Sequence, residues 1–148
     1  LRDKFCLPGM RILQFELDQL LAEVEFPKHS ITCTGTHDND TIMGWFESLP
    51  TSSTDENILT KDKLLHFFQC TIENIHWEII NFALRTSSNT VIIPLQDILG
   101  KDSSARFNIP GTLSTGNWSW RMCEGQLTPS IKEKLTDLIK NNYRNITS

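Results

Sequence analysis

The stretch Thr90–Leu95 (TVIIPL) decides the fold class of this 148-residue chain. It is a short and nearly continuous run of apolar and β-branched residues, which is typical of a strand buried on both faces of a parallel sheet. Polar residues follow at Gln96–Asp97. A second run of this kind, Ser30–Gly35 (SITCTG), leads into His37–Asp38. Because catalytic residues of parallel α/β folds lie at the carboxyl ends of strands, we expect both polar segments to contribute to one site.

Helical patterns surround these two strands. A third strand is expected at Met10–Phe15, and apolar residues at helical spacing predict helices over Glu16–Glu25, Thr41–Leu49, Thr60–Arg85 and from Thr128–Pro129 onward. The stripe within Thr60–Arg85 changes face near Cys70, so this segment is two helices or one kinked helix. Alternating strands and helices imply parallel pairing with right-handed crossovers. Three such units are either an open α/β sheet or part of an eight-stranded barrel, which needs about 250 residues.

Composition excludes several classes of function. With 14 basic and 18 acidic residues the net charge is -4, so nucleic acid is not expected as a partner. No apolar run reaches the roughly 20 residues that span a bilayer, and a membrane partner is not expected either. The four cysteines are scattered without metal-ligand spacing, which predicts reduced thiols, no metal site and a cytoplasmic protein.

The pair His37 and Asp38 has two interpretations. An imidazole can donate to a sugar hydroxyl, while a carboxylate can accept from vicinal hydroxyls and balance developing positive charge, as glycoside chemistry requires. Alternatively, Asp38 caps the helix expected near Thr41 and His37 is a buried hydrogen-bonding residue. Asp97 and its neighbour Gln96 could likewise anchor a substrate, orient a loop or cap a helix.

The polar segment that follows Asp97 is unusually long for a compact domain, which favours a functional loop. It contains Arg106 and Asn108 among its hydrogen-bond donors. The tryptophans could stack on sugar rings or pack in the core. Those considered are Trp45, Trp118 and Trp120.

Five strings in this order make the chain resemble the bacterial and plastid 4-α-glucanotransferases, also called amylomaltases. They are Gly9–Phe15 (GMRILQF), Thr34–Asn39 (TGTHDN), Pro94–Asp97 (PLQD), Arg106–Gly111 (RFNIPG) and Gly116–Arg121 (GNWSWR). The resemblance implies an α/β chain whose residues 1–148 form the C-terminal part, about strands 6–8, of a (β/α)8 TIM barrel of the α-amylase clan. The upstream part of the barrel is then absent from this chain.

The family transfers α-1,4-glucan segments between maltodextrins by a retaining double displacement. The resemblance therefore implies a maltodextrin donor, a glucan or glucose acceptor, no cofactor, and a cytoplasmic enzyme, or a plastid one in a plant. It assigns transition-state stabilisation to Asp38 and sugar contacts to His37, Asn108 and Pro110. It assigns supporting positions to Gln96, Asp97 and Arg106.

The family's Asp nucleophile and Glu acid/base have no matching motif in this sequence and are expected upstream of Leu1, so the chain alone should be inactive. Two alternatives stay open. A non-catalytic remnant would bind maltodextrin without turnover, and a hydrolase of the same clan would pass the glucosyl group to water instead of to sugar.

Overall fold

The computed structural model describes residues 2–20 and 26–144. Within them, three parallel strands form one sheet in the order β1 (Gly9–Ile12), β2 (Ser30–Cys33) and β3 (Thr90–Ile92). Ile31 of β2 pairs with Met10 on one side and with Thr90 on the other. The pairing confirms the expected parallel α/β organisation.

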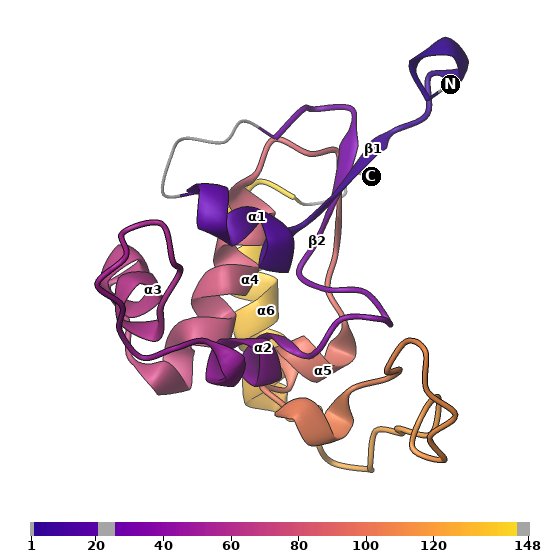
Figure 1. Cartoon of the computed structure of the whole chain (residues 1–148). Coiled ribbons are helices and arrows are strands. Elements are labelled where there is room, and N and C mark those ends of the chain that lie inside the picture. Colours follow the sequence, from indigo (N-terminus) through magenta and orange to yellow (C-terminus); the bar gives the residue numbers. More distant parts are fainter. Residues whose placement is uncertain (1, 21–25, 145–148) are drawn as a thin grey trace.

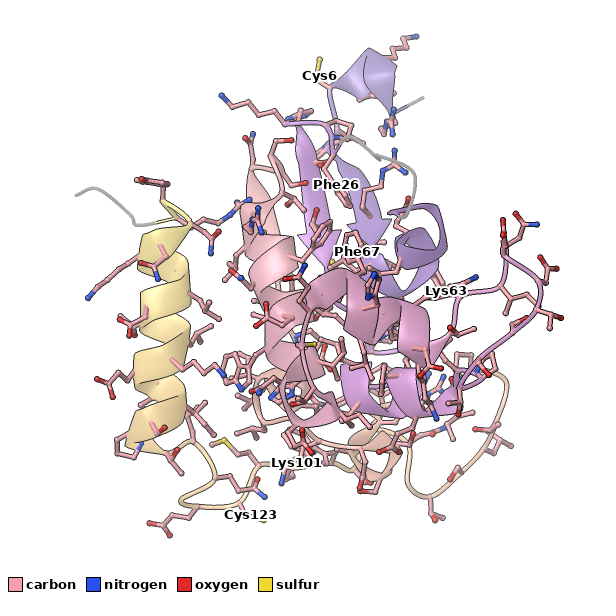
Figure 2. The ribbon with its side chains drawn as sticks, turned by 90° about the vertical axis from the view of Figure 1, so that its left-hand side faces the viewer. Cys6, Phe26, Lys63, Phe67, Lys101 and Cys123 are labelled. Atoms are coloured by element: carbon pink, nitrogen blue, oxygen red, sulfur yellow. The ribbon has the colours of Figure 1, made fainter. Side chains whose placement is uncertain are left out.

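The helices are η1 (Asp3–Phe5), α1 (Leu13–Leu20), α2 (Ile42–Ser48), α3 (Lys61–Phe68), η2 (Ile72–Asn74), α4 (Ile75–Arg85), α5 (Leu95–Ile98), η3 (Ser103–Ala105) and α6 (Pro129–Asn141). The longer ones, α1, α3, α4 and α6, lie on one side of the sheet (Figures 1 and 2). The η1 turn projects away from the rest of the chain, and α6 lies beside α4 (Figure 2).

The core lies where α4 meets its neighbouring helices and the sheet. Ile75, Ile79 and Ala83 recur at helical spacing along α4 and are at most 1 % exposed. They belong to one apolar cluster with Leu13 of α1 and Phe46 of α2. Burial of this stripe is what holds the helical layer together.

Threonines begin three of the helices. Thr41, Thr60 and Thr128 each precede a helix, and each hydroxyl accepts a hydrogen bond from a backbone N–H three residues later. The expected start at Thr128 with Pro129 in the first turn is confirmed. Gln69 ends α3 in a left-handed conformation with φ of 49°, so Thr60–Arg85 forms two helices that separate close to Cys70, as predicted.

The expected strand Met10–Phe15 is too long. The strand ends at Ile12 and α1 begins at Leu13, because Leu13 and Leu17 lie one helical turn apart and are both buried. The expected helix Glu16–Glu25 therefore starts earlier, and its last five residues lie outside the described part of the chain. The predicted strand Thr90–Leu95 likewise ends at Ile92, because Pro94 precedes α5.

The sheet face opposite the helices is open. Met10 and Ile92 are 60 % and 50 % exposed, and register places Ile12, Cys33 and Ile92 side by side on this face. The prediction that β3 is buried on both faces is wrong for the described chain, because helices cover only one face. An apolar layer without a cover is the main departure of this sheet from a closed α/β fold.

Candidate active site

The segment between β2 and α2 carries His37 and Asp38 at the carboxyl edge of the sheet. Its backbone is fixed from within, because Asn39 Oδ1 accepts hydrogen bonds from Thr36 N at 3.0 Å and from Thr36 Oγ1 at 2.7 Å. This turn leaves the His37 and Asp38 side chains exposed, with His37 Nε2 at 3.4 Å from Asp38 Oδ2. The structural alternative for both residues is wrong, since Thr41 is the cap of α2 and the His37 side chain is 58 % exposed.

The long polar segment reaches back to this loop. Asn108 Nδ2 donates to Asp38 Oδ1 at 2.7 Å, and Arg106 Nη2 donates to the Asp38 carbonyl at 2.8 Å. Arg106 Nε also donates to the Asn108 carbonyl at 2.9 Å. From a loop about seventy positions later in the chain, the Asn108 amide thus orients the Asp38 carboxylate and the guanidinium holds the Asp38 backbone.

Asp97 lies behind the site and does not line the cleft. It is 1 % exposed; its Oδ2 accepts from Thr34 Oγ1 at 2.7 Å and its Oδ1 from Ile42 N at 2.8 Å. Both ends of the His37–Asp38 loop are thereby tied to α5. Gln96 acts on the other loop, because its Nε2 lies 3.4 Å from the Ala105 carbonyl.

Burial raises the pKa of Asp97 to about 6, with the charge of Asp40 adding to the rise. A carboxyl with a raised pKa contributes most to stability below its ordinary pKa of 3.8. That contribution is lost as the pH rises through about 6. Asp97→Asn mimics the protonated form and keeps both hydrogen bonds, with Oδ1 accepting from Ile42 and Nδ2 donating to Thr34.

We therefore expect Asp97→Asn to gain about 2 kcal/mol of unfolding free energy relative to wild type between pH 4.5 and pH 8. Denaturant unfolding of the chain at both pH values measures this difference. Asp97→Ala, which leaves Thr34 and Ile42 unpaired, should lose about 1–3 kcal/mol at each pH. Parallel pH profiles for wild type and Asp97→Asn would contradict the role of burial.

Sequence reasoning missed Asp40, which joins all three strand ends. Its carbonyl accepts from Gln14 Nε2 after β1 at 2.8 Å, and its Oδ2 accepts from Ser103 Oγ at 2.8 Å in the loop after α5. Gly44 packs against both Asp40 and Ser103 so closely that a Cβ there would overlap them. The only signal in the sequence was that Asp40 is the next acidic residue after Asp38, which is too weak to single it out.

A cleft of about 790 Å³ opens in front of this loop. Its floor is the open apolar face of the sheet, with Met10, Ile12 and Ile92 among its lining residues. His37, Asp38 and Pro110 complete the wall. The described lining residues thus combine a broad apolar surface with one carboxylate and one imidazole, the arrangement typical of a small-molecule site.

The three tryptophans differ in their surroundings. Trp45 packs against the hydrophobic core, as the structural interpretation expects, and Trp120 is partly buried. Trp118 is 52 % exposed, and the centroid of its ring lies 5.2 Å from that of His37. Only this member of the three therefore adds an exposed aromatic surface next to His37.

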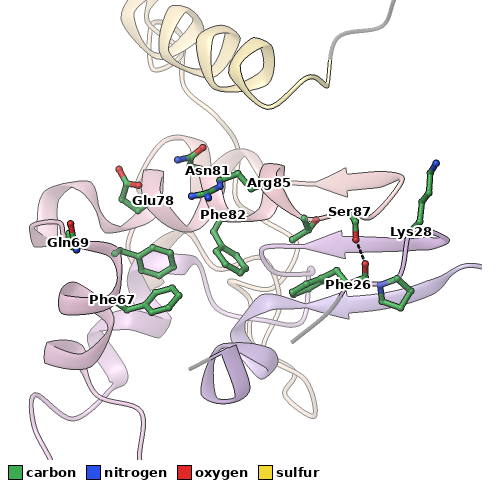
Figure 3. Close-up of a pocket in the computed structure, with 12 residues that line it drawn as sticks. Phe26, Lys28, Phe67, Gln69, Glu78, Asn81, Phe82, Arg85 and Ser87 are labelled. Carbon is green, nitrogen blue, oxygen red and sulfur yellow. Dashed lines mark hydrogen bonds between the residues drawn. The ribbon is translucent and has the colours of Figure 1, made fainter. Parts of the chain in front are cut away.

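A second pocket, of about 860 Å³, lies on the helical side of the sheet (Figure 3). Phe26, Phe67 and Phe82 point toward one another across it, with Glu78, Asn81 and Arg85 on α4 at its rim. None of the predicted site residues lines this pocket. The residues singled out by the sequence gather at the carboxyl edge of the sheet instead.

No group of three or more His, Cys, Asp or Glu side chains is arranged to hold a metal ion in residues 2–20 and 26–144. Among the described helices, none has the length and apolar content needed to cross a membrane.

The family model for 4-alpha-glucanotransferase, glycoside hydrolase family 77, matches residues 1–128. The chain belongs to this family. Its 4-alpha-glucanotransferase relatives include the Synechocystis protein, 40 % identical over 142 residues, with 92 % of this chain and 26 % of the relative covered. The Thermus thermophilus 4-alpha-glucanotransferase is 35 % identical over 153 residues, covering 97 % of this chain and 30 % of the relative.

This chain also resembles a solved structure in its fold. The amylomaltase from Streptococcus agalactiae in complex with acarbose matches with a TM-score of 0.78 and 30 % identity, covering 93 % of this chain and 27 % of that one. The chain therefore spans about a quarter of the length of the relatives that it matches.

Proposed function

We propose that this chain is the C-terminal part of a 4-α-glucanotransferase, which moves α-1,4-glucan segments from a maltodextrin to a glucan or glucose acceptor. The observation that carries the proposal is the Asp38 carboxylate, held by Asn108 at 2.7 Å in a cleft at the carboxyl edge of a parallel sheet. Active sites of TIM barrels lie at this edge. The amylomaltase neighbour was solved with acarbose, which supports an α-glucan as the ligand.

We infer that β1, β2 and β3 are the sixth, seventh and eighth strands of that barrel. Both outer strands, β1 and β3, have a free edge within the described sheet, and upstream strands would pair with them. The exposed face with Met10 and Ile92 would then become the barrel interior, which is normally filled by apolar side chains. The share of each relative that is covered, about a quarter, supports this assignment.

In the proposed reaction, Asp38 stabilises the oxocarbenium-like transition state. Its carboxylate accepts hydrogen bonds from vicinal hydroxyls of the reacting sugar and faces the positive charge that develops on the ring. His37 donates to a hydroxyl of the same sugar, while Asn108 and Pro110 border it from the second loop. Arg106, Asp97 and Gln96 hold the two loops at the required separation.

A double displacement also needs a nucleophile and an acid/base, which in retaining enzymes lie about 5 Å apart. Among the described residues that line the cleft, Asp38 is the sole carboxylate. We propose that an Asp nucleophile and a Glu acid/base come from upstream of Leu1. The coding sequence upstream of Leu1 should therefore be an open reading frame that encodes both carboxylates. A start codon at that point would contradict the proposal and favour a non-catalytic remnant. No step of the reaction requires a cofactor, and the cytoplasm, or a plastid in a plant, is the expected compartment.

The full-length enzyme encoded by that frame is expected to convert maltotriose into glucose together with chains longer than maltotriose. Transfer produces both, because each glucose released leaves a maltosyl group that extends an acceptor. Chromatography of the oligosaccharides measures the products. Formation of shorter chains alone would show hydrolysis and contradict the transferase assignment.

A further inference from the structure

Trp118 presents an exposed indole beside the His37–Asp38 pair. Its ring plane is tilted by 35° from that of His37, with 5.2 Å between the ring centroids. His37 in turn lies 3.4 Å from Asp38. An exposed aromatic residue that adjoins a polar site indicates a binding surface more strongly than one that is isolated on the surface.

The backbone of Trp118 is held in an unfavourable conformation. Its φ of 63° lies in the left-handed region, which is unfavourable for a residue with a bulky side chain. Its N–H donates to the Phe107 carbonyl at 2.7 Å, and the Phe107 ring meets the indole edge-on at 5.3 Å and 84°. These contacts fix the indole while leaving 52 % of the residue exposed. Strain of this kind concentrates at functional sites.

We propose that Trp118 is a stacking platform for the glucose ring adjacent to the one bound by Asp38 and His37. This inference rests on the proposed function and adds a subsite to it. A pyranose ring has an apolar C–H face that packs on indole, whereas its hydroxyls bond to groups at the ring edge. Because His37 contacts both Asp38 and Trp118, a glucan chain that follows these residues places consecutive rings on the carboxylate and on the indole.

The platform is tested by the dependence of affinity on chain length in the full-length enzyme. Glucose has no glycosidic bond, and thio-linked maltotriose and maltopentaose resist cleavage, so calorimetry measures the binding of all three without turnover. Trp118→Ala should weaken maltopentaose binding about tenfold, equal to about 1.4 kcal/mol, and change glucose binding less than about twofold, because one ring held by Asp38 does not reach the indole. Trp118→Phe, which keeps a ring, should retain most of the affinity. Leu113→Ala removes a fully exposed apolar side chain from the same loop and should have no effect.

The other outcomes each overturn the platform. Equal loss for glucose and both oligosaccharides, or a fall in kcat with affinities unchanged, would mean that Trp118 only positions His37. Unchanged affinity and kcat would mean that the exposed Trp118 indole does not contact the substrate. Product analysis on maltotriose tests the proposed function separately. If Trp118→Ala weakened binding in a length-dependent way but the enzyme formed no product longer than maltotriose, the platform would be supported and the transferase assignment contradicted.

Discussion

Replacing Asp38 with Asn in the full-length enzyme is expected to lower kcat on maltotriose about a thousandfold, a rise of about 4 kcal/mol in the barrier. Asn has the same shape, and its Oδ1 can still accept the hydrogen bond that Asn108 now donates to Asp38. The substitution therefore removes the negative charge and leaves the loop in place. Release of glucose from saturating maltotriose measures the effect.

Asp137→Asn is the matched control, because Asp137 is an exposed carboxylate on α6 and should keep wild-type kcat. The melting temperatures of both variants should equal that of the wild type, which separates loss of charge from loss of folding. If Asp38→Asn kept kcat within about tenfold of wild type, a change of only about 1.4 kcal/mol, Asp38 would not act in the transition state.

The 148-residue chain alone is expected to release glucose from maltotriose at least about ten thousand times more slowly than the full-length enzyme. Loss of a nucleophile or an acid/base each removes several orders of magnitude in rate. Among the described residues that line the cleft, the only carboxylate is Asp38, to which we assign transition-state stabilisation. The described lining of the cleft therefore lacks both a nucleophile and an acid/base. A coupled glucose assay at equal molar concentrations measures the difference.

Co-expression with the upstream segment provides the control for this second experiment. The segment should cover the open face with Met10 and Ile92 and restore transfer, whereas the same segment with the Asp38→Asn chain should not. Turnover by the isolated chain within about tenfold of the full-length rate would mean that the described residues contain the whole catalytic machinery.

Much of the fold could be predicted because its strands and helix starts have strong local signals. The β-branched runs at Ser30–Gly35 and Thr90–Leu95 predicted β2 and β3, and Thr128 with Pro129 marked the start of α6. The boundary at Leu13 could not be predicted, since the apolar positions 10, 12, 13 and 15 of this segment fit strand and helix equally. Exposure of β3 could not be predicted either, because it depends on what covers the second face.

The candidate site was also only partly predictable. His37 and Asp38 were proposed from their position after a strand, and the structure brings Asn108 and Arg106 to Asp38. The sequence did not show how Asp97 acts, because its partners Thr34 and Ile42 are more than fifty residues away. Asp40 was missed for this reason too, since its contacts with Gln14 and Ser103 exist only in the folded chain.

The contact of Gly44 with Asp40 and Ser103 also limits how substrate specificity can be redesigned. Segments 36–44 and 103–108 share these contacts and the bonds from Arg106 and Asn108 to Asp38. If only one of the two segments is replaced by that of a relative, its side chains no longer match their partners on the other segment. The two segments must therefore be exchanged together, as a single cassette, although about sixty residues of chain separate them.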